Sequence, residues 1–144
     1  ILAFFMLVFA VRAQTTASLQ VSTFVIEAPQ LKTFKKIWVY LPIGYHDSTQ
    51  SYPVIYMHDA QNLFDATTSY VGEWKVDETL DEKNAQTIVI GIEHGNEKRI
   101  DELTPFAHPS YKGGNGKNYL DFIVETLKPH IDVAYRTLPG KENT

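Results

Sequence analysis

Two short apolar segments, residues 54–58 (VIYMH) and 87–93 (TIVIGIE), constrain the fold more than any other feature of the sequence. Apolar residues fill them almost throughout, which is typical of strands buried on both faces of a parallel sheet. Between them, residues 72–86 (GEWKVDETLDEKNAQ) mix apolar and acidic positions and predict a short amphipathic helix. Strand, helix and strand together predict a right-handed crossover that leaves the two strands parallel.

Two further strands and a second helix are predicted around this unit. Residues 22–29 and 35–42 are rich in β-branched and aromatic residues, and each segment ends at a proline. Residues 118–135 carry apolar residues at helical spacing, but Pro129 lies among them and predicts a kink or a division. Residues 94–116 predict a long irregular stretch, which in a compact domain is usually functional or mobile. The element order predicts an α/β fold.

Composition limits the classes of partner. The chain has 144 residues, of which 44% are hydrophobic and 21% charged, as expected of about one globular domain. A net charge of -4 and a pI near 5.7 argue against a nucleic acid or an anionic membrane as the partner. The absence of cysteine excludes disulfides, thiol catalysis and zinc–thiolate sites.

The first residues resemble an export signal. Residues 1–11 are uninterrupted apolar residues, too few for a membrane span of about 20 residues. Val11 and Ala13 supply small residues before a cleavage site, so residues 1–13 predict a signal peptide, N-terminally incomplete because it lacks an initiator Met and a basic region. Residues 14–144 would then form the domain of a secreted or periplasmic protein, with no membrane contact after signal removal. A buried strand or helix is the alternative for the apolar run.

Polar residues follow both buried strands. His58 and Asp59 follow one strand, and Glu93 and His94 end the other. Because ligands bind beyond the carboxyl ends of strands in open parallel sheets, these residues predict the rim of a cleft. The alternative is that they only cap the sheet and hold loops by hydrogen bonds. With His108 they could also serve a metal-dependent hydrolase, but neighbours on a strand point to opposite faces and no HExxH spacing is present, so no metal site is predicted.

The sequence contains no candidate nucleophile for a serine hydrolase. Such enzymes carry G-x-S-x-G on a strand-to-helix elbow. None of the six serines has glycines two residues to either side. The serines are Ser18, Ser22, Ser48, Ser51, Ser69 and Ser110.

Residues 113–117 (GGNGK) lack the spacing of a phosphate-binding loop and predict a flexible hinge before a helix.

Four ordered segments resemble the front half of the putative esterase family, whose α/β-hydrolase fold is shared by enterochelin-esterase and feruloyl-esterase domains. The resemblance covers residues 20–144. It implies a three-layer fold, with a mostly parallel sheet and helices on both faces, truncated before the strand that carries the nucleophile elbow. The segments are residues 35–65, 72–82, 88–106 and 113–144.

The resemblance implies a secreted carboxylic-ester hydrolase of the serine type that acts on a small-molecule ester without a cofactor. The Ser, Asp and His of its triad are expected beyond Thr144, so the 144-residue chain is expected to be inactive alone. A non-catalytic binding module on the same scaffold is the alternative. Residues 54–58 would then form an apolar sheet edge, because a further strand pairs with them in this fold. The oligomeric state is not predicted.

By the same resemblance, the loop of residues 58–62 (HDAQN) supplies part of an oxyanion hole. One donor in this fold is a backbone N–H of the loop after the third strand. Asp59 or Ala60 is the expected donor, with Gln61 next, and His58 is expected to organise the loop.

Aromatic side chains downstream of this loop are expected to line the substrate pocket. They are Phe64, Tyr70 and Trp74, with His94 beside them. Packing of the aromatic residues in the core is the alternative.

Overall fold

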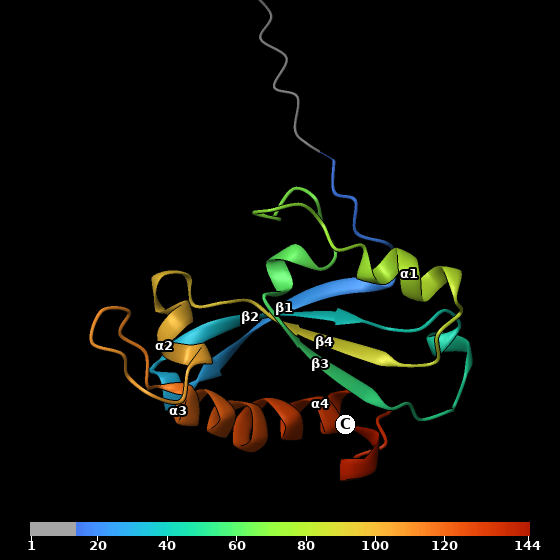
Figure 1. Ribbon diagram of the computed structural model, residues 1–144. Coiled ribbons are helices and arrows are strands. Elements are labelled where there is room, and N and C mark those ends of the chain that lie inside the picture. Colours follow the sequence, from blue (N-terminus) through green and yellow to red (C-terminus); the bar gives the residue numbers. More distant parts are fainter. Residues whose placement is uncertain (1–13) are drawn as a thin grey trace, which may run out of the picture.

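The computed structural model describes residues 14–144 (Figure 1). The predicted signal peptide, residues 1–13, lies outside the described residues. Within the described chain, no helix has the length and apolar character needed to cross a membrane.

The sheet has four strands in the order β1-β2-β4-β3. β3 runs parallel to β4, in register from Val54 opposite Ile88 to His58 opposite Ile92, which confirms the predicted crossover. β1 and β2 are antiparallel because the short turn at Pro29–Leu31 cannot make a crossover. β2 and β4 are also antiparallel, so the described sheet is mixed, with its parallel pair at one edge. The strands are β1 Val21–Ala28, β2 Thr33–Tyr40, β3 Val54–His58 and β4 Ile88–Ile92.

Helices cover both faces of the sheet, as predicted. In Figure 1, α1 lies above the sheet and the continuous coil from α3 to α4 lies below it. The α-helices are α1 Val76–Glu82, α2 Arg99–Leu103, α3 Gly116–Asp121 and α4 Lys128–Ala134. Single 3-10 turns are η1 Pro29–Leu31, η2 Tyr45–Asp47, η3 Ala60–Asn62, η4 Asn96–Lys98 and η6 Lys141–Asn143, and η5 Phe122–Leu127 is a π-helix.

Each face of the sheet has its own apolar core. Successive strand residues point to opposite faces, so alternate residues of β2 and β4 enter different cores. Burial of each large apolar side chain contributes about 1.5–3 kcal/mol. The core beneath the sheet contains Ile37, Val39, Ile88, Ile90, Ile92, Phe122, Leu127 and Ile131, and the core above it contains Trp38, Tyr40, Ala60, Leu63, Phe64 and Val89.

Pro129 lies within one continuous coil and changes its hydrogen bonding without dividing it, although a kink or a division was predicted. Proline lacks an N–H, and its ring crowds the carbonyl four residues earlier. The chain accommodates it with the π-helical segment Phe122–Leu127, after which the N–H of Lys128 bonds to the carbonyl of Ile123, five residues back. The helix therefore continues past the proline with a local change in hydrogen bonding.

The stretch predicted to be irregular, residues 94–116, contains a helix. α2 occupies Arg99–Leu103 within it. Its sequence is mostly polar, so it carries no amphipathic pattern, and its position depends on a buried ion pair described below. The glycine segment expected to be a flexible hinge is packed: the N–H of Gly116 donates to the carbonyl of Thr104, and a Cβ at Gly116 would lie 2.8 Å from that oxygen.

Replacing Gly91 by valine should destabilise the fold. A Cβ at Gly91 would lie 2.8 Å from the Cβ of Ala60 and 3.3 Å from Leu63, so η3 would have to move off β4. We expect the free energy of unfolding, measured by urea denaturation, to fall by about 1–3 kcal/mol. Ser22→Val, at an exposed position of β1, is the control. An unchanged midpoint in Gly91→Val would contradict the close packing of η3 on β4.

Candidate active site

The chain turns sharply at the carboxyl end of β3. Asp59 adopts the left-handed conformation, with φ 55° and ψ 43°, and η3 begins at the next residue. The carbonyl of Asp59 accepts the N–H of Asn62 at 2.9 Å. Within the described residues, the backbone N–H groups of Ala60 and Gln61 have no hydrogen-bond acceptor. The turn therefore leaves two adjacent donors without a protein acceptor, as the first N–H groups of a helix are. Ala60 is fully buried, whereas Gln61 is half-buried and lines a pocket.

Arg99 holds this turn from α2. Its Nε and Nη2 donate to Oδ1 and Oδ2 of Asp59, each at 2.7 Å. Such a bidentate pair fixes geometry as well as charge. These hydrogen bonds hold the pKa of Asp59 below its ordinary value, although burial acts in the opposite direction. Asp59 therefore remains ionised and tied to α2 at neutral pH.

A second ion pair fixes α2 on the sheet. Lys35 of β2 and Glu102 of α2 are 2.5 Å apart, and each side chain is 3% exposed. The ring of Tyr119, on α3, lies 5.9 Å from the Lys35 ammonium. Burial, with the charges of Glu102 and Asp59, raises the pKa of Tyr119, so its hydroxyl stays protonated. That hydroxyl forms a 2.9 Å hydrogen bond with Nδ1 of His58, which joins the end of β3 to α3.

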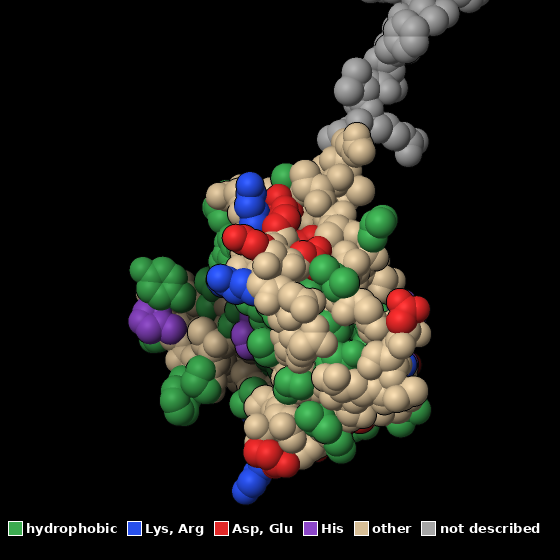
Figure 2. Space-filling model, turned by 90° about the vertical axis from the view of Figure 1, so that its right-hand side faces the viewer, with side chains coloured by type: hydrophobic (Ala, Val, Ile, Leu, Met, Phe, Trp, Pro, Cys, Tyr) green, Lys and Arg blue, Asp and Glu red, His purple; other side chains and the backbone are tan. Residues whose placement is uncertain are grey.

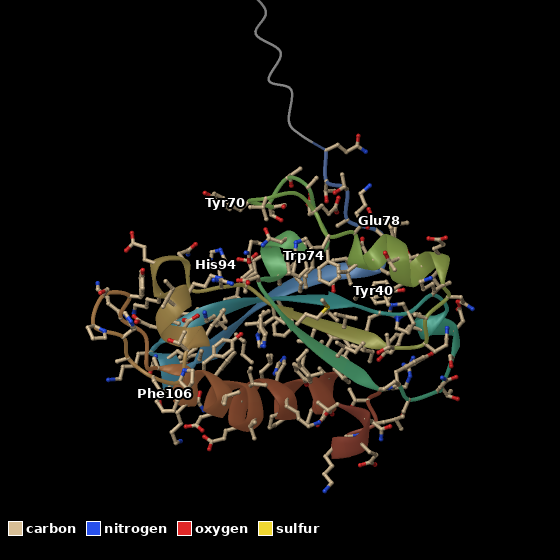
Figure 3. The ribbon with its side chains drawn as sticks, in the orientation of Figure 1. Tyr40, Tyr70, Trp74, Glu78, His94 and Phe106 are labelled. Carbon is tan, nitrogen blue, oxygen red and sulfur yellow. The ribbon has the colours of Figure 1, made fainter. Side chains whose placement is uncertain are left out.

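Two pockets meet at the Asp59–Arg99 pair. The first has a volume of about 550 Å³ and brings together five residues predicted for the site or its rim. Figure 3 shows Tyr70, Trp74 and His94 above the sheet, on the side that carries α1. The second pocket, about 590 Å³, includes His58, Tyr119 and Leu120. The five predicted residues of the first pocket are Asp59, Gln61, Tyr70, Trp74 and His94.

Phe64 does not line either pocket. It is fully buried, and its ring stacks on Trp38 with 6.0 Å between centroids. The prediction that Phe64 contacts substrate is therefore corrected: η3 turns this side chain inward, into the core above the sheet. Trp74 and Tyr70 differ from it, since they are 55% and 89% exposed.

The residues considered as metal ligands are engaged separately. Asp59 is paired with Arg99, and Glu93 accepts the indole N–H of Trp38 at 2.8 Å. Nδ1 of His94 accepts the N–H of Asn96, and Nδ1 of His108 accepts that of Ser110. Across residues 14–144, no three of these proposed ligands come together in a group that could hold an ion.

Four residues of the site were missed by the sequence analysis. Arg99 and Glu102 lie in the stretch expected to be irregular, and their partners are 40 and 67 residues away in sequence. Lys35 and Tyr119 lie in elements that were predicted, but the pattern gave them no role in a site. The one sequence signal was the charge of Lys35 itself, in a segment predicted to be a strand.

Comparison with known proteins gives the family. The sequence profile named Putative esterase matches residues 28–144, and the chain belongs to this family. A search of curated proteins gave no match. Among solved structures, the chain resembles an IroE-like serine hydrolase from Shewanella oneidensis, with a TM-score of 0.66 and 26% identity over 81% of this chain and 39% of that one.

Two more distant structures share the fold. The enterobactin esterase FES from Shigella flexneri has a TM-score of 0.65 and 12% identity over 89% of this chain and 30% of that one. A ferulic acid esterase has a TM-score of 0.53 and 19% identity over 85% of this chain and 47% of that one. The chain thus spans less than half the length of each of these three structures.

Replacing Arg99 by glutamine should raise the pKa of Asp59 toward its ordinary value of 3.8. A carboxyl whose pKa is lowered by folding stabilises the protein above the ordinary value, and this contribution is lost as the pH falls from about 4 through the lowered pKa. Carboxyl NMR titration measures the shift directly. Lys98→Gln, the neighbouring exposed cation, is the control. An identical Asp59 titration in Arg99→Gln would show that Arg99 does not hold the turn.

Proposed function

We propose that the chain is the part of a secreted carboxylic-ester hydrolase of the serine type that contributes one side of the oxyanion hole. The observation that carries this proposal is the left-handed turn at Asp59, after which the N–H groups of Ala60 and Gln61 have no acceptor among the described residues at the carboxyl end of β3. In the α/β-hydrolase fold, one oxyanion donor comes from the loop after this strand. Membership of the esterase family supports the reaction class.

In the proposed reaction, a serine hydroxyl attacks the ester carbonyl and the carbonyl oxygen becomes an oxyanion. A backbone N–H of the turn donates to this oxygen, the alcohol leaves, and water hydrolyses the acyl-enzyme. Loss of one such donor costs about 2.7–4 kcal/mol of transition-state stabilisation. The Ser, Asp and His of the triad would lie in the part of the esterase fold that this chain does not span and that the matched structures contain. His58, through Tyr119, would organise the loop.

The pocket beside the turn is proposed to bind an aromatic part of the ester. Trp74, Tyr70 and Val71 form an exposed apolar wall next to Gln61 and His94. Aromatic rings prefer such surfaces, on which they stack. Two structures that share the fold are named as an enterobactin esterase and a ferulic acid esterase, which agrees with a small ester as the substrate. No cofactor enters the proposed reaction.

The experiment that tests the proposal is fluorophosphonate labelling of the natural secreted protein, measured by intact mass. These reagents modify activated serines. The proposal predicts a labelled species of about twice the mass of this chain, because 81% of this chain covers 39% of the IroE-like hydrolase. An unlabelled secreted protein, or ester hydrolysis that survives complete labelling, would overturn the serine mechanism.

Replacing Trp74 by alanine in the natural secreted enzyme, unlabelled, should lower kcat/KM for an aryl ester by about tenfold or more, because the ring loses an apolar contact. Hydrolysis of a simple acetyl ester should change less. Tyr111→Ala removes another exposed aromatic side chain, which lies outside this pocket, and is the control. Equal losses for both esters in Trp74→Ala would remove Trp74 from substrate recognition.

A further inference from the structure

An acidic cluster lies at the start of α1, in contact with the segment that precedes β1. Figure 2 shows acidic side chains gathered near the top of the molecule, close to the first described residues, and Figure 3 shows Glu78 on α1. Glu73, Asp77 and Glu78 each present a carboxylate oxygen, and these oxygens lie within 4.8 Å of one another. Like charges this close repel unless a positive charge or a proton lies between them.

The burial of Asp77 is a second and separate observation. Asp77 is fully buried, and its Oδ2 accepts the N–H of Ser18 at 2.7 Å. Its Oδ1 is buried as well and has no hydrogen-bond partner. Burial, with the adjacent Glu78, raises the pKa of Asp77 to about 6, so the carboxylate is ionised above this pH. An ionised carboxylate is normally buried only when it is paired or coordinates a metal. Among the described residues, none of the ion pairs involves Glu73, Asp77 or Glu78.

We propose that Glu73, Asp77 and Glu78 bind a calcium ion. The donors are all hard carboxylate oxygens, with no nitrogen or sulfur ligand, which favours a group-two cation over a transition metal. Two donors are consecutive in a helix and the third comes from the preceding loop, an irregular set that suits the flexible coordination of Ca²⁺ better than the strict octahedron of Mg²⁺. Water completes the remaining positions. With three carboxylates, one of them exposed, the Kd should be about 10⁻⁴–10⁻³ M.

The proposed ligand residues and their neighbour Trp74 are hydrogen-bonded to two other segments of the chain. Ser18 contacts Asp77, and the hydroxyl of Thr16 donates to Glu73 at 2.9 Å, so the segment before β1 is tied to the cluster. Trp74 follows Glu73 directly, and its N–H donates to the carbonyl of Asn62 in η3. Calcium binding would therefore stabilise both the N-terminal segment and the loop that carries Trp74. This inference stands on its own geometry and does not depend on the proposed esterase reaction.

The test is Ca²⁺ titration of the purified protein, with thermal unfolding and Tb³⁺ luminescence as the two measurements. Tb³⁺ replaces Ca²⁺ at oxygen sites and is excited by a nearby indole, here that of Trp74. We expect millimolar Ca²⁺ to raise the melting temperature by a few degrees, the same concentration of Mg²⁺ to raise it less, and Ca²⁺ to displace bound Tb³⁺.

Glu78→Gln is the decisive variant, because Glu78 is exposed and its loss should not disturb folding. It should weaken Ca²⁺ binding at least tenfold, and Asp77→Asn should do the same where that variant folds. Glu82→Gln, at the exposed end of the same helix and outside the cluster, should bind Ca²⁺ as the unmodified protein does. Absence of binding at 10 mM Ca²⁺, or unchanged binding in Glu78→Gln, would overturn the proposal.

Discussion

Lys35 and Glu102 form an ion pair inside the protein, and the geometry of the candidate site depends on it. The pair joins the central strand β2 to the short helix α2, which has little apolar surface of its own to bury. Removing one partner of a buried pair typically costs about 3–5 kcal/mol, because the other charge is left uncompensated. α2 therefore has one stable position on the sheet, and Arg99 is placed beside the end of β3.

Arg99 also fixes the turn after β3, in which the N–H groups of Ala60 and Gln61 have no acceptor among the described residues. Arg99 donates hydrogen bonds to both carboxylate oxygens of Asp59, the residue in the left-handed conformation. A left-handed residue that is not glycine costs free energy and persists where its surroundings hold it. On the far side of the turn, Ala60 packs against Gly91 of β4, where a larger side chain would not fit. The donors are thus fixed from α2 on one side and from the sheet on the other.

The sequence predicted the parts of this fold that depend on local pattern. Apolar runs identified β3 and β4, and the amphipathic segment between them predicted the parallel crossover. α2 was missed because its residues are polar and its position is set by partners 40 and 67 residues away. Residue type alone could not tell that Phe64 is buried in the core and that Trp74 lines the pocket, because both are aromatic. The turn of η3 buries Phe64 and leaves Trp74 beside the pocket. Family resemblance suggested residues 58–62 as the loop of the oxyanion hole, which stays a proposal, and the conformation of its turn required the structure.

The proposed function depends above all on the turn at Asp59, whose N–H groups would stabilise the oxyanion of the tetrahedral intermediate formed when the serine attacks the ester. The most direct measurement is a crystal structure of the natural enzyme after fluorophosphonate modification, because the phosphoryl oxygen of the adduct mimics that oxyanion. The account predicts this oxygen within about 2.7–3.1 Å of the backbone nitrogen of Ala60 or Gln61. A phosphoryl oxygen held by other donors, with both of these nitrogens out of hydrogen-bonding range, would contradict it.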